Sequence, residues 1–201
     1  MNDYAFDFFM VNVRSLRQHL TDLETDVFAT KSKIVAVVET WLDPAKNDSI
    51  SSTLGHYHGV SIGRSRGCGA FLPSKCQTPS TVDEQFQLLS VPISSDSQIV
   101  VIYLSKECDY QKVISSLQQH IELKPKTYFI GDFNFDKDEN NALGQFLTNQ
   151  GYVQMISRPT HEKGGTIDHL YVPRQDKENI ELHFTYPYFT DHLAICVKLK
   201  R

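Results

Sequence analysis

The sequence Thr127-Tyr128-Phe129-Ile130-Gly131-Asp132-Phe133-Asn134 has the composition of a buried strand that ends in polar residues. Its first half is β-branched and aromatic, as is typical of strands. Asp132 and Asn134 are two positions apart, so an extended backbone would place both side chains on one face. A carboxylate and an amide next to a glycine suit the binding of a phosphate and its water. Gly, Asp and Asn are also ordinary turn residues, so a simple strand ending is the alternative.

Length and composition predict one globular domain over residues 1–201. Of the 201 residues, 40% are hydrophobic and 22% are charged, which is enough to bury a core and argues against disorder. The predicted strands begin and end close to the chain ends, so we expect a domain excised from a longer protein. The formal net charge of -4 argues against indiscriminate coating of nucleic acid but permits local basic patches.

Cysteine usage and the N-terminal sequence predict an intracellular protein. The four cysteines have no CxxC spacing, so we interpret them as reduced thiols and not as a disulfide framework or a zinc site. Asp3 and Asp7 stand where a signal peptide would be basic. The longest apolar runs are too short to span a membrane.

Apolar patterns predict strands interrupted by helices. Two further buried strands each end on a polar residue, residues 6–11 before Asn12 and residues 34–38 before Glu39. Helices are predicted after Ser15 with an apolar stripe as far as Val27, after Asp109, and over residues 139–150. The other strand candidates are residues 57–62, 69–72, 86–91, 99–104, 152–156, 166–172, 180–186 and 193–199. This alternation favours mixed sheets covered by helices.

The polar residues that end or interrupt these strands form a set of side chains that suits one kind of chemistry. They are Asn12, Glu39, Tyr103, Asp132, Asn134, Asp168, Asp191 and His192. Several carboxylates brought together repel one another unless a hard cation lies among them. A histidine with a nearby aspartate is the usual arrangement for an oriented imidazole. The inventory therefore suits metal-assisted hydrolysis of a phosphodiester.

The order of six short motifs resembles the endonuclease/exonuclease/phosphatase superfamily. The motifs are Asn-Val-Arg-Ser-Leu (12–16), Glu-Thr-Trp-Leu (39–42), the strand carrying Tyr103, Gly-Asp-Phe-Asn (131–134), Thr-Ile-Asp-His (166–169) and Thr-Asp-His (190–192). Within the superfamily, the sequence is most similar to the endonuclease domains of non-LTR retrotransposons and Helitron-like mobile elements. The phrase Pro-Thr-His…Gly-Gly-Thr-Ile-Asp-His points there as well.

This resemblance implies a four-layer α/β sandwich, two mixed β-sheets packed face to face with helices outside. It implies a Mg²⁺-dependent enzyme, in which Mn²⁺ can substitute, that nicks DNA and leaves 3′-hydroxyl and 5′-phosphate ends. Glu39 would hold the metal with Asp191 nearby. The catalytic set would be Asn12, Tyr103, Asp132, Asn134, Asp168 and His192, with Asp132 activating or positioning the attacking water and Asp168 holding His192.

Departures from the superfamily pattern occur at two of these motifs. Arg14 stands where repair nucleases carry an acidic residue two positions after the first Asn, which leaves a second metal site in question. No proline follows Tyr103 in Leu-Ser-Lys-Glu.

Four arginines are candidates for substrate binding: Arg14, Arg64, Arg66 and Arg158. Most lie in predicted loops, where contact with DNA phosphates competes with an ordinary surface role. The resemblance further implies DNA as partner, no membrane, a monomeric domain, fusion to a reverse transcriptase or a helicase, and a nuclear location. Two alternatives stay open: a phosphodiesterase or phosphatase acting on a small or lipid substrate, and a domesticated nucleic-acid-binding module without activity.

Overall fold

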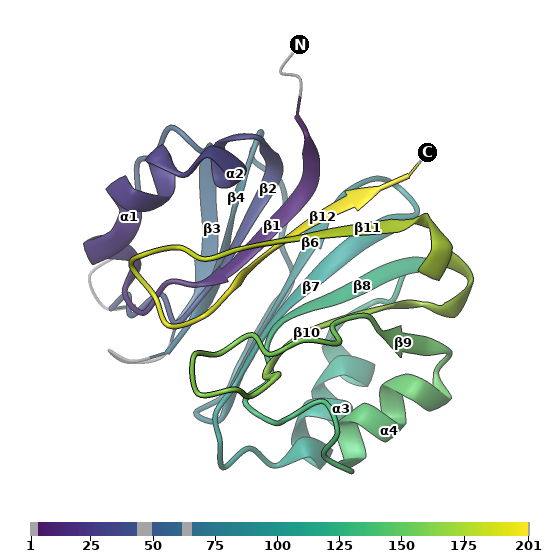
Figure 1. Cartoon of the computed structure of the whole chain (residues 1–201). Coiled ribbons are helices and arrows are strands. Elements are labelled where there is room, and N and C mark those ends of the chain that lie inside the picture. Colours follow the sequence, from purple (N-terminus) through teal and green to yellow (C-terminus); the bar gives the residue numbers. More distant parts are fainter. Residues whose placement is uncertain (1–3, 44–49, 62–65, 201) are drawn as a thin grey trace.

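Two six-stranded mixed sheets pack face to face in the computed structural model, which describes residues 4–43, 50–61 and 66–200 (Figure 1). The first sheet has the order β11-β12-β1-β2-β4-β3 and the second the order β5-β6-β7-β8-β10-β9. The strands of the first are β1 (Phe6–Asn12), β2 (Ser32–Val38), β3 (His56–Val60), β4 (Cys68–Leu72), β11 (Ile180–Thr185) and β12 (Ala194–Leu199). Those of the second are β5 (Ser80–Val82), β6 (Phe86–Pro92), β7 (Ser97–Leu104), β8 (Lys126–Asp132), β9 (Tyr152–Gln154) and β10 (Asp168–Pro173).

Helices cover the outer face of each sheet, which confirms the predicted four-layer α/β sandwich. On the first sheet lie α1 (Leu16–Thr25) and α2 (Val27–Thr30), and on the second lie α3 (Tyr110–His120) and α4 (Ala142–Asn149). A 3₁₀ helix, η2 (Arg174–Asn179), joins β10 to β11. In the described ranges no helix has the length and apolar character needed to cross a membrane.

The central strands are apolar on both faces because each face packs on a different layer. In β1, Phe8 and Met10 belong to the core between the sheets, whereas Phe9 and Val11 pack with the residues beneath α1 and α2. This two-sided burial explains why the central strands read as continuous apolar runs and not as alternating ones.

Both sheets contain one parallel pair of strands at their centre. In the first sheet β1 pairs with β2 after a helical crossover, and in the second β7 pairs with β8 across α3. Strand β1 contacts β8, and β2 contacts β7, between the two layers. Ligands of such sheets bind at the carboxyl ends of the parallel strands. Here these ends carry Asn12, Tyr103 and Asp132, and Glu39 follows β2.

Several predicted boundaries were wrong. The first predicted helix is two helices, because the Asp26 side chain accepts hydrogen bonds from the backbone N–H groups of Phe28 and Ala29 and so caps a new one. Asp168 is the first residue of β10 and does not lie inside it. Strand β5, which contains Thr81 between two exposed residues, lacks the apolar pattern that would have predicted it.

Gly131 is required where β8 approaches β7. Its φ is +151°, and a Cβ there would lie 1.8 Å from the carbonyl oxygen of Ile102. We expect Gly131→Ala to lower the free energy of unfolding by roughly 3–5 kcal/mol, through backbone strain and overpacking together.

Urea denaturation of the substituted proteins checks this expectation. Gly151→Ala is the matched control, because Gly151 has φ +86° but a Cβ there meets nothing within 4 Å. It should cost only about 1–2 kcal/mol, the backbone part alone. Equal losses in the two variants would contradict the clash with Ile102.

Candidate active site

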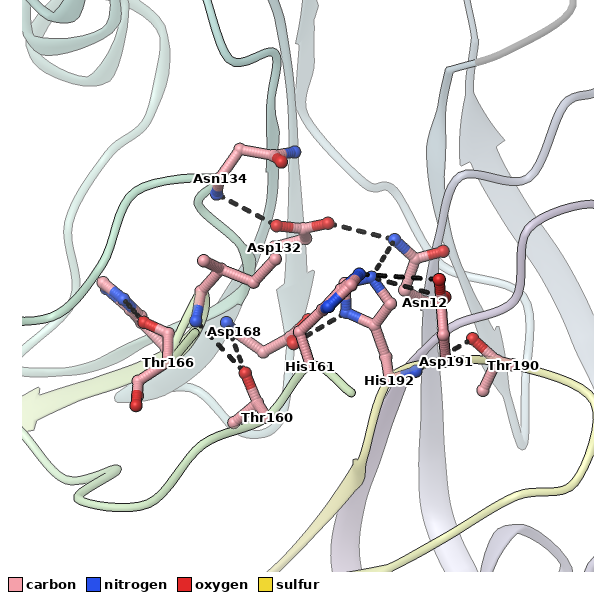
Figure 2. Close-up of polar contacts among 12 residues, drawn as sticks. Asn12, Asp132, Asn134, Thr160, His161, Thr166, Asp168, Thr190, Asp191 and His192 are labelled. Atoms are coloured by element: carbon pink, nitrogen blue, oxygen red, sulfur yellow. Dashed lines mark hydrogen bonds and ion pairs between the residues drawn. The ribbon is translucent and has the colours of Figure 1, made fainter. Parts of the chain in front are cut away.

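Four buried polar side chains converge where the carboxyl ends of the central parallel strands of the two sheets meet (Figure 2). Asn12 ends β1, Asp132 ends β8, Asp168 begins β10, and His192 lies just before β12. Asp132 and Asp168 are direct neighbours in the antiparallel register of β8 and β10. All four are at most 7% exposed. The fold thus holds two carboxylates, an amide and an imidazole in a small space with little water.

Asp168 and His192 form the strongest polar pair of the site. His192 Nδ1 lies 2.8 Å from Asp168 Oδ2. Because the carboxylate only accepts, Nδ1 carries a proton and donates it, which leaves Nε2 facing the cluster. Burial alone would lower the pKa of His192, but the hydrogen bond and charge of Asp168, with the charges of Asp132 and Asp191, raise that pKa to about 9. The imidazole is therefore a cation at neutral pH.

Asn12 is oriented from both ends of its amide. Its oxygen accepts a hydrogen bond from the backbone N–H of Arg14 at 3.1 Å, so its NH₂ group points inward. That group donates to Asp132 Oδ2 at 3.0 Å and lies 3.4 Å from His192 Nε2. When the ring is protonated, Asn12 and His192 both present N–H donors at this contact, so it is not a hydrogen bond. The hydrogen bonds with the Arg14 backbone and with Asp132 therefore fix Asn12.

Asp132 is a carboxyl group with an unusually high proton affinity. Burial, first, and then the charge of Asp168 raise its pKa well above the usual range, with a smaller contribution from Glu39; His192 and the backbone N–H of Asn134 act in the opposite direction. That N–H donates to Asp132 Oδ1 at 2.9 Å. A carboxyl group with a raised pKa is suited to accept a proton at neutral pH.

Asn134 lies in a turn and does not share a strand face with Asp132. Its φ of +53° ends the extended backbone, so the expectation of two side chains on one strand face was wrong. Its side-chain NH₂ donates to the carbonyl oxygen of Leu104, which ties the end of β8 to the end of β7. Gly131 and Asp132 are still paired with β7 and β10, so the turn begins only after Asp132.

The Asp191 carboxylate contacts an arginine and a histidine. Arg14 Nη1 lies 2.9 Å from Asp191 Oδ2, and His161 Nε2 lies 3.5 Å from the same oxygen. His161 Nδ1 accepts a hydrogen bond from the backbone N–H of Lys163, so its proton is on Nε2, which points at Asp191. The other oxygen, Asp191 Oδ1, is 3.8 Å from His192 Nε2.

Tyr103 flanks Asp132 on the side away from Asp168, and the charge of Glu39 acts on both residues. Tyr103 is 7% exposed and pairs with Asp132 in the parallel register of β7 and β8. Burial, then the charges of Glu39 and Asp132, raise the pKa of Tyr103, while Arg66 opposes them. The hydroxyl group therefore keeps its proton and remains a hydrogen-bond donor.

The backbone is strained around this cluster. Among the residues that the structure describes, five non-glycine residues have a positive φ, and all of them lie just after β1, β2 or β8: Arg14, Ser15, Glu39, Trp41 and Asn134. Such conformations cost about 1–3 kcal/mol each and concentrate at functional sites. Their grouping at three strand ends supports this edge of the sandwich as the candidate functional edge.

The loop between β9 and β10 makes hydrogen bonds to the segments that carry Asp168 and His192. The Thr160 side chain accepts hydrogen bonds from the backbone N–H groups of Ile167 and Asp168, and the carbonyl oxygen of Thr160 accepts from Leu193. His161 of this loop forms an isolated antiparallel β-bridge with His192, which lies in the loop between β11 and β12. The loop therefore fixes Asp168 and His192 relative to each other.

Solved structures with the same architecture come from DNA-processing enzymes. A 3′ phosphatase from Neisseria bound to a product DNA hairpin aligns with a TM-score of 0.74 and 14% identity, over 98% of this chain and 100% of that one. The endonuclease domain of TRAS1, a telomere-specific non-LTR retrotransposon, aligns at 0.69 and 12%, over 96% and 97%. An endonuclease/exonuclease/phosphatase family protein from Leptotrichia buccalis aligns at 0.61 and 13%, over 98% and 100%.

The fold is that of the endonuclease/exonuclease/phosphatase superfamily. At this level of identity the similarity establishes the architecture. No protein-family model matches the sequence, and no curated protein sequence does either. The resemblance inferred from six short motifs therefore agrees with the fold, and the chemistry has to be argued from the site.

The donor set of this site fits a divalent metal ion. Two buried carboxylate oxygens, Asp168 Oδ1 and Asp191 Oδ1, have no hydrogen-bond partner within the described ranges. Two groups have ligand atoms within 4.8 Å of one another: His161, Asp191 and His192, and Asp132, Asp168 and His192. Glu39 belongs to neither, although its charge acts on Asp132. Hard oxygen ligands with excess negative charge suit Mg²⁺ or Mn²⁺.

The candidate arginines differ in their surroundings. Arg14 pairs with Asp191, and the charge of Arg66 acts on Tyr103. Arg158 contacts Tyr186 on the loop that leads to Asp191. Arg64 lies outside the described residues.

His161 was missed as a site residue. The sequence showed His161 only as part of the Pro-Thr-His motif. Its contact with Asp191 joins two loops that are separated in the sequence, so no local pattern predicts it.

The charge state of His192 is measurable by NMR. In metal-free protein with chelator, we expect its ring to titrate near pH 9, and Asp168→Asn to lower that pKa by more than Asp191→Asn does, because Asp168 supplies the hydrogen bond. The protonated ring stabilises the fold fully below its unfolded pKa of 6.5, and this contribution is lost as the pH rises through 9. A ring in the wild type that titrates at or below 6.5 would contradict the pairing.

Proposed function

We propose that this chain is a Mg²⁺-dependent DNA endonuclease that nicks one strand and leaves 3′-hydroxyl and 5′-phosphate ends. The observation that carries the proposal is the contact of Asn12, Asp132, Asp168 and His192 at the carboxyl ends of the central strands. It joins a carboxyl group of raised pKa to a protonated imidazole. These are the two groups that the addition of water to a phosphodiester requires.

Asp132 is the residue that activates water. Its Oδ1 is occupied by the N–H of Asn134, and its Oδ2 by the amide of Asn12. Both bonds fix the direction of the carboxylate, and Asn12 adds a donor for the water or the phosphate. Desolvation of Asp132 favours its protonated form, which drives removal of a proton from water.

His192 donates to the phosphoryl oxygen as negative charge develops there. Asp191 Oδ1 lies 3.8 Å from its Nε2, beyond hydrogen-bond distance, and no other acceptor among the described residues takes this proton. Asp168 keeps the ring protonated and oriented from Nδ1. Tyr103, whose hydroxyl group keeps its proton, adds a second donor from β7. Both donors are fixed before substrate arrives, which makes them effective in a dry site.

Glu39 and Asp191 are the proposed metal-binding residues, Glu39 from the order of motifs and Asp191 because it also belongs to one of the two groups of close ligand atoms. When bound there, Mg²⁺ or Mn²⁺ supplies charge neutralisation at the phosphate and the leaving oxygen. Arg14 already neutralises Asp191 Oδ2, so the Arg14–Asp191 ion pair supports one metal ion and not two.

The biological setting is inferred from motifs and from one neighbour. The order of motifs resembles the endonuclease domains of mobile elements, and the fold aligns with the endonuclease domain of a non-LTR retrotransposon. We therefore propose a mobile-element endonuclease that acts on DNA in the nucleus as a monomeric domain fused to a reverse transcriptase or a helicase.

Plasmid nicking tests the activity. Conversion of supercoiled plasmid to open circles should require Mg²⁺ or Mn²⁺, stop with chelator, and slow by about 10²–10⁴-fold in Asp132→Asn. Asp138→Asn makes the same chemical change at an exposed residue and should nick like the wild type. Nicking by Asp132→Asn at the wild-type rate would reject the proposed role of Asp132. Hydrolysis of a small phosphodiester with intact plasmid would favour the small-substrate alternative.

A double-mutant cycle tests whether Asp168 and His192 act as one unit. Asp168→Asn and His192→Ala should each slow single-turnover nicking by about 10²–10⁴-fold, and the double variant should be little slower than the poorer single one. Circular dichroism confirms that each variant folds. Losses that multiply would show that the two residues act independently.

A further inference from the structure

The two oxygens of the Asp191 carboxylate have different surroundings (Figure 2). Arg14 Nη1 and His161 Nε2 both approach Oδ2, at 2.9 Å and 3.5 Å. Oδ1 is buried, has no hydrogen-bond partner among the described residues, and lies 3.8 Å from His192 Nε2. A buried carboxylate oxygen without a partner is costly unless it serves a ligand. Asp191 is therefore held at one oxygen while the other stays available beside the catalytic cluster.

Arg14 and His161 hold Asp191 with different firmness. The Arg14 side chain is 49% exposed, so water weakens its ion pair with the carboxylate. The His161 side chain is only 16% exposed. Its backbone is bridged to His192, and the next residue, Glu162, donates its N–H to the carbonyl oxygen of Asp191 at 2.9 Å. His161 is therefore the more rigid of the two groups.

The proton of the neutral His161 ring lies on the nitrogen that approaches Asp191. Nδ1 accepts a hydrogen bond from the backbone N–H of Lys163 at 3.1 Å, and a ring nitrogen that accepts carries no proton. Nε2 therefore presents an N–H to the carboxylate. A neutral donor orients the carboxylate without cancelling its charge, whereas the Arg14 guanidinium does cancel it. Asp191 needs that negative charge to bind a hard cation.

His161 could orient Asp191 or could itself bind the metal ion, since ligand atoms of His161, Asp191 and His192 lie within 4.8 Å of one another. To bind a metal, Nε2 would have to give up its proton to Nδ1. The Nδ1–H would then oppose the N–H of Lys163, and that hydrogen bond would be lost. Mg²⁺ also prefers oxygen ligands to imidazole. The geometry therefore favours the orienting role.

We propose that His161 is a positioning residue that holds Asp191 by Oδ2 and so directs Oδ1 to the divalent metal ion, which raises the affinity of the site for that ion. This inference rests on the proposed metal-dependent function. In the opposing interpretation, the His161 ring only packs on the His192 ring, whose centre lies 4.8 Å away, and has no influence on the metal. Groups that orient a metal ligand typically contribute about 10- to 100-fold to metal affinity.

Electron paramagnetic resonance of free Mn²⁺ measures this affinity without DNA or cleavage. His161→Leu keeps the bulk and removes the N–H, so it should raise the Kd for Mn²⁺ by about 10- to 100-fold. His161→Gln offers an amide N–H to Asp191 and should stay within about threefold of the wild type. If the ring serves only for packing, Leu should be tolerated at least as well as Gln. Circular dichroism confirms that both variants fold.

His183→Leu is the matched control. His183 on β11 lies 2.9 Å from a carboxylate oxygen of Glu181 and packs edge-on against the ring of Phe6. Its replacement removes the same kinds of contact away from the site and should leave Mn²⁺ binding unchanged. Equal affinities of His161→Leu and His183→Leu overturn the proposal, and so does a loss in His161→Gln as large as in His161→Leu.

Electron spin echo modulation of bound Mn²⁺ separates orientation from direct binding. The wild type should show no modulation from a directly bound imidazole nitrogen. Such a signal, lost in His161→Gln, would make His161 a ligand and overturn its positioning role.

Plasmid nicking measured in parallel keeps the two proposals apart. A wild type that binds Mn²⁺ without nicking rejects the endonuclease function, and the comparison of His161→Leu with His161→Gln still decides the role of His161. A wild type that binds no Mn²⁺ overturns both.

Discussion

Two buried carboxylates face each other across β8 and β10, and the rest of the site serves to make that contact tolerable. Asp132 and Asp168 are register partners with at most 1% exposure, an arrangement that repels strongly in a dry environment. The protein compensates with His192 on one carboxylate and Asn12 on the other. The charge of Asp168 raises the pKa of Asp132, and the charges of both carboxylates keep the imidazole of His192 protonated. A pair of hydrophobic residues here would be more stable and chemically inert.

The sandwich brings these groups together because each sheet has its parallel pair at the centre. The carboxyl ends of β1, β2, β7 and β8 meet at one edge, and every predicted metal or catalytic side chain lies on one of these strands, just after one, or on a segment packed against them. The helices on the outer faces leave this edge uncovered (Figure 1). The loops there have strained backbones, so the positions of the polar side chains are set by the fold and not by the substrate.

Sequence reasoning predicted the parts of the site that depend on local pattern. Asn12 and Glu39 were recognisable because each ends a continuous apolar run, and the four-layer architecture followed from the order of motifs. The turn conformation of Asn134 was not predicted, because its φ depends on the contact with Leu104 from another strand. The Arg14–Asp191 ion pair and the role of His161 were missed for the same reason. Pairs 177 and 30 residues apart leave no signal in one sequence.

The contact between Asn12 and His192 has a consequence for synthesis of the protein on the ribosome. These two residues are 180 positions apart, and β1 pairs directly with β12, the last strand of the chain. Strand β1 is synthesised early, but the edge of β1 that pairs with β12 stays unpaired until β12 has been made. Only then can the Asn12 amide contact the His192 imidazole. Translation that stops before β12 therefore yields no assembled site. The candidate site is therefore assembled only once β12 has been added to the sheet beside β1.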